Sequence, residues 1–194
     1  MPKVERRPKY KWIASDAITR TAVSGTSGDH GVLSGRGDND HPQYLLLSTV
    51  FPSVRVYNSG DITIPNDDMT ALTFDSEDWD TAGFHSTTTN TDRLTIPSGY
   101  DGTYWMLGNA QFEANAAGQR IYEIALNATT VIQHAQHPAP SAVDRVALAV
   151  PTLYQLDVDD YVQFRVYQNR GGTLDIRSVA SWSPYFMMIR LGPK

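Results

Sequence analysis

Apolar and polar residues alternate along much of the chain beyond residue 50. Between Tyr104 and Phe112 every second position is apolar or glycine. In the segment DYVQFRVYQN, Val162, Phe164 and Val166 would share one face of an extended chain. A period of two indicates β-strands that bury one face. Both segments are therefore predicted to be strands.

Further strands are predicted where short runs of β-branched and aromatic residues lie between turn sequences such as SGYDG, NRGG and DVDD. These runs begin near Val54, Ile62, Leu72, Arg120, Arg145, Thr173 and Tyr185. The segment QHAQHPAP is predicted to be a loop, because prolines flank its histidines. Roughly eight to ten short strands without an amphipathic helix favour an all-β sandwich over residues 51–194.

The first 50 residues have a different character. Turn-forming residues crowd the run SGTSGDHGVLSGRGDNDHP, which argues against a long regular element. Seven Lys and Arg and five Asp and Glu give this segment a formal charge of +2, whereas the remainder carries −7. The basic arm from Lys3 to Lys11 would either dock on an acidic partner or remain a solvated terminus.

Composition narrows the function classes. The 194 residues include no Cys, which excludes disulfides, thiolate metal sites and a cysteine nucleophile. An acidic body does not favour nucleic acid as a partner, because phosphate contacts need clustered cations. No apolar run approaches the roughly 18 residues that span a bilayer, so membrane insertion is not expected. The start MPKVERRPKYKW lacks the apolar stretch of a signal peptide, so export by the usual route is not expected.

The segment DHGVLSGRGDNDHPQYLLLS, residues 29–48, resembles a motif that recurs in bacteriophage tail-fibre and minor virion proteins. Arg36 departs from the motif, which usually has an apolar residue there. The resemblance implies an attachment and trimer-alignment role for residues 1–50. The positions that carry it are His30, Leu33, Ser34, Gly35, Asp38, Asp40, His41, Pro42, Gln43, Tyr44 and Leu45.

A second resemblance covers most of residues 51–194. The run SGDITIPNDDMTALTFDSEDWDTAGF and the later pieces GQRIYEIALN and LDVDDYVQFRVYQN are similar to the jelly-roll head shared by the globular domain of the first complement component, the tumour-necrosis-factor ligands and many phage fibre tips. This resemblance implies a ten-stranded jelly-roll β-sandwich that is stable as a homotrimer, with apolar aromatics around a three-fold axis. The absence of a collagen stalk, a signal peptide and cysteines favours the phage branch.

The aromatic content is high for one sandwich core. Four Trp, ten Tyr and six Phe exceed what two sheets need between them, and aromatic residues are favoured at interface centres. Either a partner surface or ordinary core and strand-face positions would account for them. The residues in question are Tyr100, Tyr104, Trp105, Tyr122 and Tyr161.

Candidate chemistry is sparse. Six carboxylates fall within 14 positions, namely Asp67, Asp68, Asp75, Glu77, Asp78 and Asp80. They would either bind Ca²⁺ or form a solvated acidic loop. These residues, or Asp157, Asp159 and Asp160, could also form the paired acids of a glycosidase.

The histidines and a search for known catalytic motifs give little support for catalysis or metal binding. His134 and His137 would form a metal pair only on a helix. In a trimer, His30 and His41 would either gather around a metal on the axis or simply hold a turn by hydrogen bonding. The sequence contains no nucleophile elbow and no phosphate-binding loop. We therefore predict a protein that is not an enzyme and that has no cofactor or bound metal.

These patterns together predict a bacteriophage head or tail fibre, or a spike, on the exposed surface of the virion. Residues 1–50 would bind other virion proteins and align three chains, and residues 51–194 would form a head that binds a host cell-surface glycan or protein. The stretches 75–92 and 133–144 are the predicted recognition loops, at the end of the head far from the attachment. One alternative is a capsid decoration protein that stabilises the particle without host binding, and another is a polysaccharide depolymerase.

Overall fold

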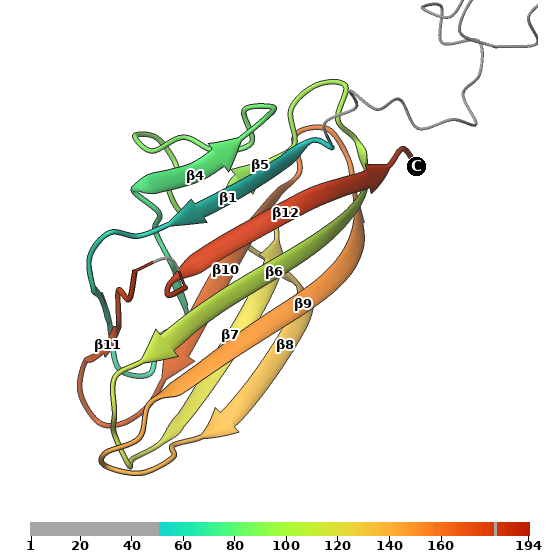
Figure 1. Cartoon of the computed structure of the whole chain (residues 1–194). Helices are drawn as coiled ribbons and strands as arrows, with labels where there is room; N and C mark the ends of the chain where they lie inside the picture. Colours follow the sequence, from blue (N-terminus) through green and yellow to red (C-terminus); the bar gives the residue numbers. More distant parts are fainter. Residues whose placement is uncertain (1–50, 181) are drawn as a thin grey trace, which may run out of the picture. The chain divides into compact units, whose positions relative to one another are not determined.

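The computed structural model describes residues 51–180 and 182–194, and the chain in these residues forms twelve strands and no helix (Figure 1). The predicted attachment segment, residues 1–50, lies outside the described residues, so its boundary and its role stay predictions. The strands are β1 Ser53–Tyr57, β2 Ile62–Ile64, β3 Thr70–Ala71, β4 Ser76–Asp80, β5 Leu94–Thr95, β6 Gly102–Phe112, β7 Gln119–Leu126, β8 Thr130–Pro138, β9 Val146–Leu156, β10 Tyr161–Gln168, β11 Leu174–Ile176 and β12 Tyr185–Gly192.

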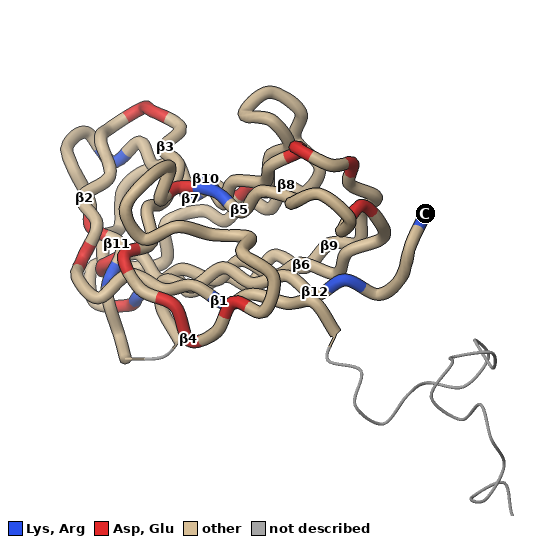
Figure 2. The backbone as a smooth tube through the Cα atoms, turned by 90° about the horizontal axis from the view of Figure 1, so that it is seen from above, with Lys and Arg blue, Asp and Glu red and all other residues tan. Residues whose placement is uncertain are grey.

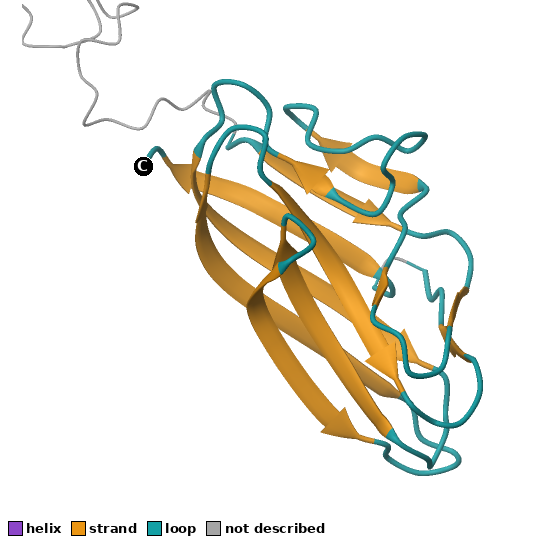
Figure 3. Ribbon diagram, turned by 180° about the vertical axis from the view of Figure 1, so that it is seen from behind, coloured by secondary structure: helices purple, strands orange, loops and turns teal. Residues whose placement is uncertain are grey.

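Two antiparallel sheets stack face to face. The first sheet has seven strands in the order β2-β11-β6-β12-β1-β4, with β9 on the other side of β6. The second has five strands in the order β3-β10-β7-β8, with β5 also paired to β10. Figure 2 shows the two layers from above, and Figure 3 shows the long strands of both layers from behind. The predicted all-β jelly-roll sandwich is confirmed, and ten of its strands have three or more residues.

The core lies between the sheets, where the predicted alternation places it. Along β6 burial alternates at every position, so that Tyr104, Met106 and Phe112 point inward. The inward side of β10 carries Phe164, whose ring stacks against Phe186 of the opposite sheet at 5.9 Å between centroids. Burying such side chains contributes about 1.5–3 kcal/mol each.

The two ends of the sandwich differ in what they carry. The described chain begins at Phe51 and finishes at Lys194 at one end, which we call the near end (Figure 1). The opposite end, the far end, is made by the loops 113–118, 139–145 and 169–173, because β6, β8 and β10 all finish there. The loop 81–93 leaves β4 next to the start of β1, where the Thr81 amide donates to the carbonyl of Ser53 at 3.0 Å, so it belongs to the near end.

Two sequence predictions about loops are wrong. The segment QHAQHPAP is largely strand, since β8 runs from Thr130 to Pro138. Among the described strands β8 pairs with β7 alone, so it is an edge strand of its sheet. An edge tolerates a proline because one row of its backbone groups needs no partner. The two predicted recognition stretches also do not share one end, since 75–92 contains β4 and the near-end loop, whereas only 139–144 of the second stretch is a far-end loop.

Candidate functional site

The outward side of the seven-stranded sheet carries an apolar surface. Trp105 of β6 lies between Leu153 of β9 and Ile189 of β12 in the strand register. One row further along the strands, Leu107 lies in the same way between Pro151 and Met187. These positions alternate with core residues, so their side chains point away from the core. We call the following set the apolar sheet face: Trp105, Leu107, Ala149, Pro151, Leu153, Met187 and Ile189.

Exposure separates the apolar sheet face from ordinary scattered apolar residues. Leu153 is 58% exposed, whereas Leu107 and Met187 are partly covered by their neighbours in the sheet. Three adjacent strands contribute, so the residues are contiguous. Contiguous apolar surface of this kind marks a contact site on a soluble protein.

Polar and charged groups border this face. On the β1 side, the Arg55 guanidinium lies 4.5 Å from the centroid of the Tyr185 ring and forms an ion pair with Asp78. On the β9 side, Lys194 pairs with Asp157, and a cavity of about 550 Å³ is lined by Thr103, Leu153, Tyr154, Gln155 and Lys194. An apolar centre with a polar border is the usual composition of a protein interface.

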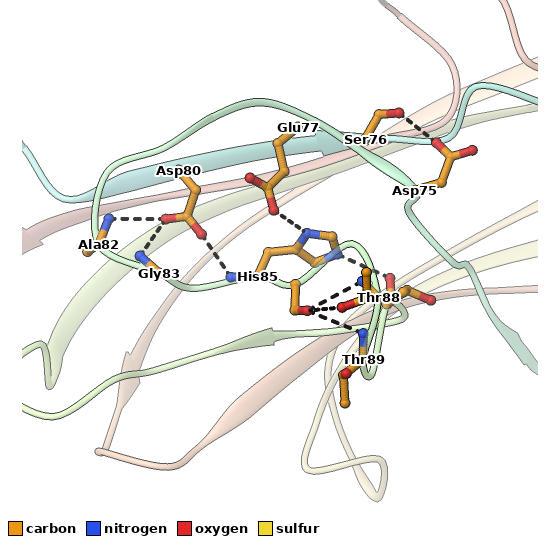
Figure 4. Close-up of polar contacts among 11 residues, drawn as sticks. Asp75, Ser76, Glu77, Asp80, Ala82, Gly83, His85, Thr88 and Thr89 are labelled. Carbon is orange, nitrogen blue, oxygen red and sulfur yellow. Dashed lines mark hydrogen bonds and ion pairs between the residues drawn. The ribbon is translucent and has the colours of Figure 1, made fainter.

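The near-end loop 81–93 is held by the carboxylate of Asp80 (Figure 4). The backbone amides of Ala82 and Gly83 donate to Asp80 Oδ1 at 3.1 and 2.8 Å, and the amide of His85 donates to Oδ2 at 2.9 Å. Three donors on one carboxylate fix the turn that leaves β4. The acidic residue that the sequence offered for metal binding is here used to shape the loop.

His85 fixes the same loop from inside. Its side chain is fully buried, with Nδ1 2.9 Å from Glu77 Oε1 and Nε2 3.3 Å from the carbonyl oxygen of Thr91. One neighbour belongs to β4 and the other to the loop itself, so the ring is fixed on both sides. The buried imidazole therefore ties the loop to β4 through Glu77.

Two further acidic candidates, Asp75 and Asp160, also serve local structure. Burial opposes ionisation of Asp75, but hydrogen bonds from Ser59 and Ser76 hold the pKa of its carboxyl below the ordinary value. In the turn before β10, Asp160 accepts from the Asp157 amide and from the Asn127 side chain, each at 2.8 Å. Among residues 51–180 and 182–194, no three His, Asp or Glu side chains are arranged to hold a metal ion.

The outer surface of the five-stranded sheet holds a second charged group. Glu123 is only 7% exposed, and it accepts from Arg165 at 2.9 Å and lies 3.0 Å from His134 Nδ1. His137 is three residues along the same strand, so it points to the opposite face. The histidine pair weighed from the sequence does not form.

The aromatic residues divide between core and surface. Tyr104 and Tyr122 are buried between the sheets, and Tyr100 packs partly buried against that core. Trp105 lies on the apolar sheet face, and Tyr161 lies on the outer surface beneath Arg93. Tyr100, Tyr104 and Tyr122 are therefore core residues, and Trp105 and Tyr161 are strand-face residues. A partner surface at Trp105 stays a prediction.

The motif residues His30 to Leu45 lie outside the described part of the chain, so their role stays a prediction. The apolar sheet face could not be read from the sequence, because nothing local pairs β6 with both β9 and β12. The sequence feature that marks this face is that the outward positions of the strands are apolar as well as the inward ones. This feature can be recognised only after the inward positions have been identified. Within the described residues there is no helix long and apolar enough to cross a membrane.

Comparison with known proteins identifies the fold. The chain is similar to the tumour-necrosis-factor protein Eiger from S. frugiperda (14% identity, TM-score 0.55, covering 75% of this chain and 96% of that one). It is also similar to murine APRIL (9% identity, TM-score 0.56, covering 73% of this chain and 100% of that one). A third similar structure is the globular domain of zebrafish complement 1qA (13% identity, TM-score 0.53, covering 74% of this chain and 99% of that one). The fold is thus the jelly roll of tumour-necrosis-factor and complement globular domains. No protein-family model and no curated protein sequence matches the chain.

Proposed function

We propose that this protein is a trimeric fibre or spike head on a bacteriophage particle, and that it binds the host cell surface. The motif at residues 29–48 supports the virion assignment, and the jelly-roll fold supports a binding head. In this proposal residues 1–50 attach the head to other virion proteins.

The observation that carries the proposal is the apolar sheet face. Three copies of it turned toward a common axis would cover Leu107 and its neighbours, whose exposure in a single chain costs solvation free energy at about 25 cal/mol per Å². A closed three-fold arrangement buries every copy and leaves no face open for further growth. The polar border at Arg55 and Lys194 would then remain at the rim.

Host contact is assigned to the far end. The loops 113–118, 139–145 and 169–173 lie opposite the end where the described chain begins, and loops held by a rigid scaffold are the usual carriers of binding. Val143 is 84% exposed there. Three weak sites on one head, and many heads on a particle, would add by avidity.

Assembly is tested by light scattering on the full chain. The wild-type protein is expected at three times the mass of a single chain. Leu107→Lys is expected to be a folded monomer, because the lysine would be buried without a partner charge. Val143→Lys, which adds the same charge at the far end, should stay trimeric. A monomeric wild-type protein would overturn the proposal.

The role on the particle is tested by comparing phage that carry and lack the protein. A host-binding head predicts slower adsorption with unchanged capsid stability to heat and low salt. Reduced capsid stability with normal adsorption would instead support the decoration alternative. Release of reducing ends from host polysaccharide would support a depolymerase.

A further inference from the structure

Arg93 differs from the other described arginines in its partners. Within residues 51–180 and 182–194, every other arginine side chain bonds to a carboxylate or to a backbone carbonyl: Arg55, Arg120, Arg145, Arg165, Arg170, Arg177 and Arg190. Arg93 instead contacts the Tyr161 ring at 4.5 Å from its centroid. Its Nε is buried and has no hydrogen-bond acceptor among the described residues.

The acids near Arg93 in the chain are already engaged. Glu77 is bonded to His85, Asp80 accepts three backbone amides, and Asp92 accepts from the Gln163 side chain at 2.5 Å. A guanidinium carries five donors that favour planar oxyanions. The fork of Arg93 therefore offers donors that the described chain leaves unused.

A cavity of about 220 Å³ opens beside this guanidinium. It is lined by Gly83, Phe84, His85, Ser86, Thr89, Asn90, Arg93 and Thr95. No carboxylate is among the lining residues, whereas Arg93 is cationic. Thr89 and Asn90 are exposed at its edge, and their polar side chains add neutral hydrogen-bonding groups.

The loop that lines the cavity is held by its own hydrogen bonds. The Ser86 hydroxyl accepts from the amides of Thr88 and Thr89 at 3.4 and 3.2 Å, and Figure 4 shows Thr88 and Thr89 near His85. The Arg93 guanidinium is held over the Tyr161 ring in the same way, by a contact within the chain. Preorganisation of this kind reduces the entropic cost of binding.

We propose that this near-end cavity binds an oxyanion carried on a ligand of monosaccharide size, with the Arg93 fork as the main contact. The volume is below the roughly 300 Å³ of pockets for larger organic ligands. A sugar carboxylate and a sugar phosphate share the chemistry that the site recognises. The site lies within one chain and does not depend on the proposed assembly or on host binding.

The test is a titration of the full-length protein followed by NMR amide shifts. Three probes share one sugar ring: glucuronate, glucose 6-phosphate and neutral glucose. At least one of the two anions is expected to give saturable shifts at Thr89, Asn90 and Tyr161, whereas glucose gives none. The anion that binds identifies the carboxylate or the phosphate as the source of the oxyanion. Raising the salt concentration should weaken binding.

Variants assign the effect to the fork. Arg93→Gln is expected to weaken anion binding at least tenfold, and Arg93→Lys, which keeps the charge but loses the fork, should fall between it and wild type. Arg177→Gln, the matched change at an arginine that pairs with Asp61 and Glu113 outside the loop 81–93, should bind as wild type.

Three results would overturn the proposal: equal shifts with glucose, no saturable shift with either anion, or wild-type affinity in Arg93→Gln. If Arg93→Gln does not fold, the comparison of anions with glucose on the wild-type protein decides by itself. The adsorption experiment above uses none of these probes, so failure of the host-binding role would be seen separately.

Discussion

At the scale of single residues, the sandwich depends on one glycine where the two sheets approach closely. A Cβ added at Gly108 of β6 would lie 2.5 Å from Cδ2 of the Phe164 ring on the opposite sheet. Phe164 is fully buried and packs on Phe186, so the ring has little freedom to move aside. The glycine is required for packing rather than for backbone conformation.

Gly108→Ala is therefore expected to lower the free energy of unfolding by about 1–3 kcal/mol, the usual cost of overpacking. The measurement is urea unfolding followed by fluorescence. Gly172→Ala is the control, because its Cβ would meet only the Arg170 side chain at 3.6 Å, and it should change stability by less than about 0.5 kcal/mol. Equal effects of the two substitutions would contradict the packing argument.

Two buried tyrosines make stability depend on alkaline pH. Burial raises the pKa of Tyr104 to about 12 and also raises the pKa of Tyr122, against about 10 in an unfolded chain. Above pH 10 the unfolded chain releases protons that the folded chain retains, so ionisation favours unfolding. The contribution of the two protonated tyrosines to the free energy of unfolding is complete below pH 10 and is lost as the pH rises toward 12.

Urea unfolding at several pH values between 8 and 11.5 should show this loss, with a slope of up to about 1.4 kcal/mol per pH unit for each tyrosine. Tyr104→Phe is expected to flatten the curve, and the double variant with Tyr122→Phe to flatten it further. An unchanged slope in the double variant would exclude these residues as the cause.

At the scale of elements, alternation predicted the strands well where one face is buried and the other is not. The faces of β10 and the inward set of β6 agree with the sequence prediction. The strand predicted from Thr173 has only the three residues of β11. The segment QHAQHPAP, predicted to be a loop, is largely strand. Proline misled the prediction there, because its missing N–H excludes it from a central strand but not from an edge.

The loop 81–93 gives an element-scale prediction. Asp80→Ala leaves the amides of Ala82, Gly83 and His85 without their acceptor, so their hydrogen exchange is expected to accelerate, while exchange in β6 and β10 stays slow. Hydrogen-exchange mass spectrometry measures both regions in one experiment. Asp68→Ala, at an exposed carboxylate before β3, should leave the loop unchanged. Uniform acceleration over the whole domain would show instead that Asp80 stabilises the fold globally.

At the scale of the whole molecule, the sequence predicted the sandwich but not its surfaces. Trp105 was already a candidate for a partner surface, but its neighbours Leu153 and Ile189 are some 50 and 80 residues away in the chain and meet it only through sheet pairing. That the guanidinium of Arg93 is unpaired among the described residues could not be predicted from the sequence either, because the sequence does not show that the nearby acids bond to other groups. The alternation of residues along a strand predicts which side chains are buried. The composition of a surface site depends instead on how strands that are distant in the chain pair with one another.

The proposed burial of the apolar sheet face between chains would make stability depend on protein concentration. The thermal midpoint of the wild-type protein is expected to rise by several degrees over a hundredfold increase in protein concentration, because association favours the folded state by mass action. The midpoint of Leu107→Lys should be lower and independent of concentration. Differential scanning calorimetry gives both. A wild-type midpoint that does not move would argue against assembly through this face.

The first and the last described residues, Phe51 and Lys194, both lie at the near end, and this has a mechanical consequence. A particle that pulls on residue 51 while a host holds the far end would load β1 along its own length. The hydrogen bonds from β1 to β12 and β4 lie across that direction, so they would bear the force together, in shear. Pulling residue 51 away from residue 194 would instead peel β1 from β12 one pair at a time, beginning at Ser53 and Ile189. The same head would therefore resist traction from a bound cell far better than separation of its own ends.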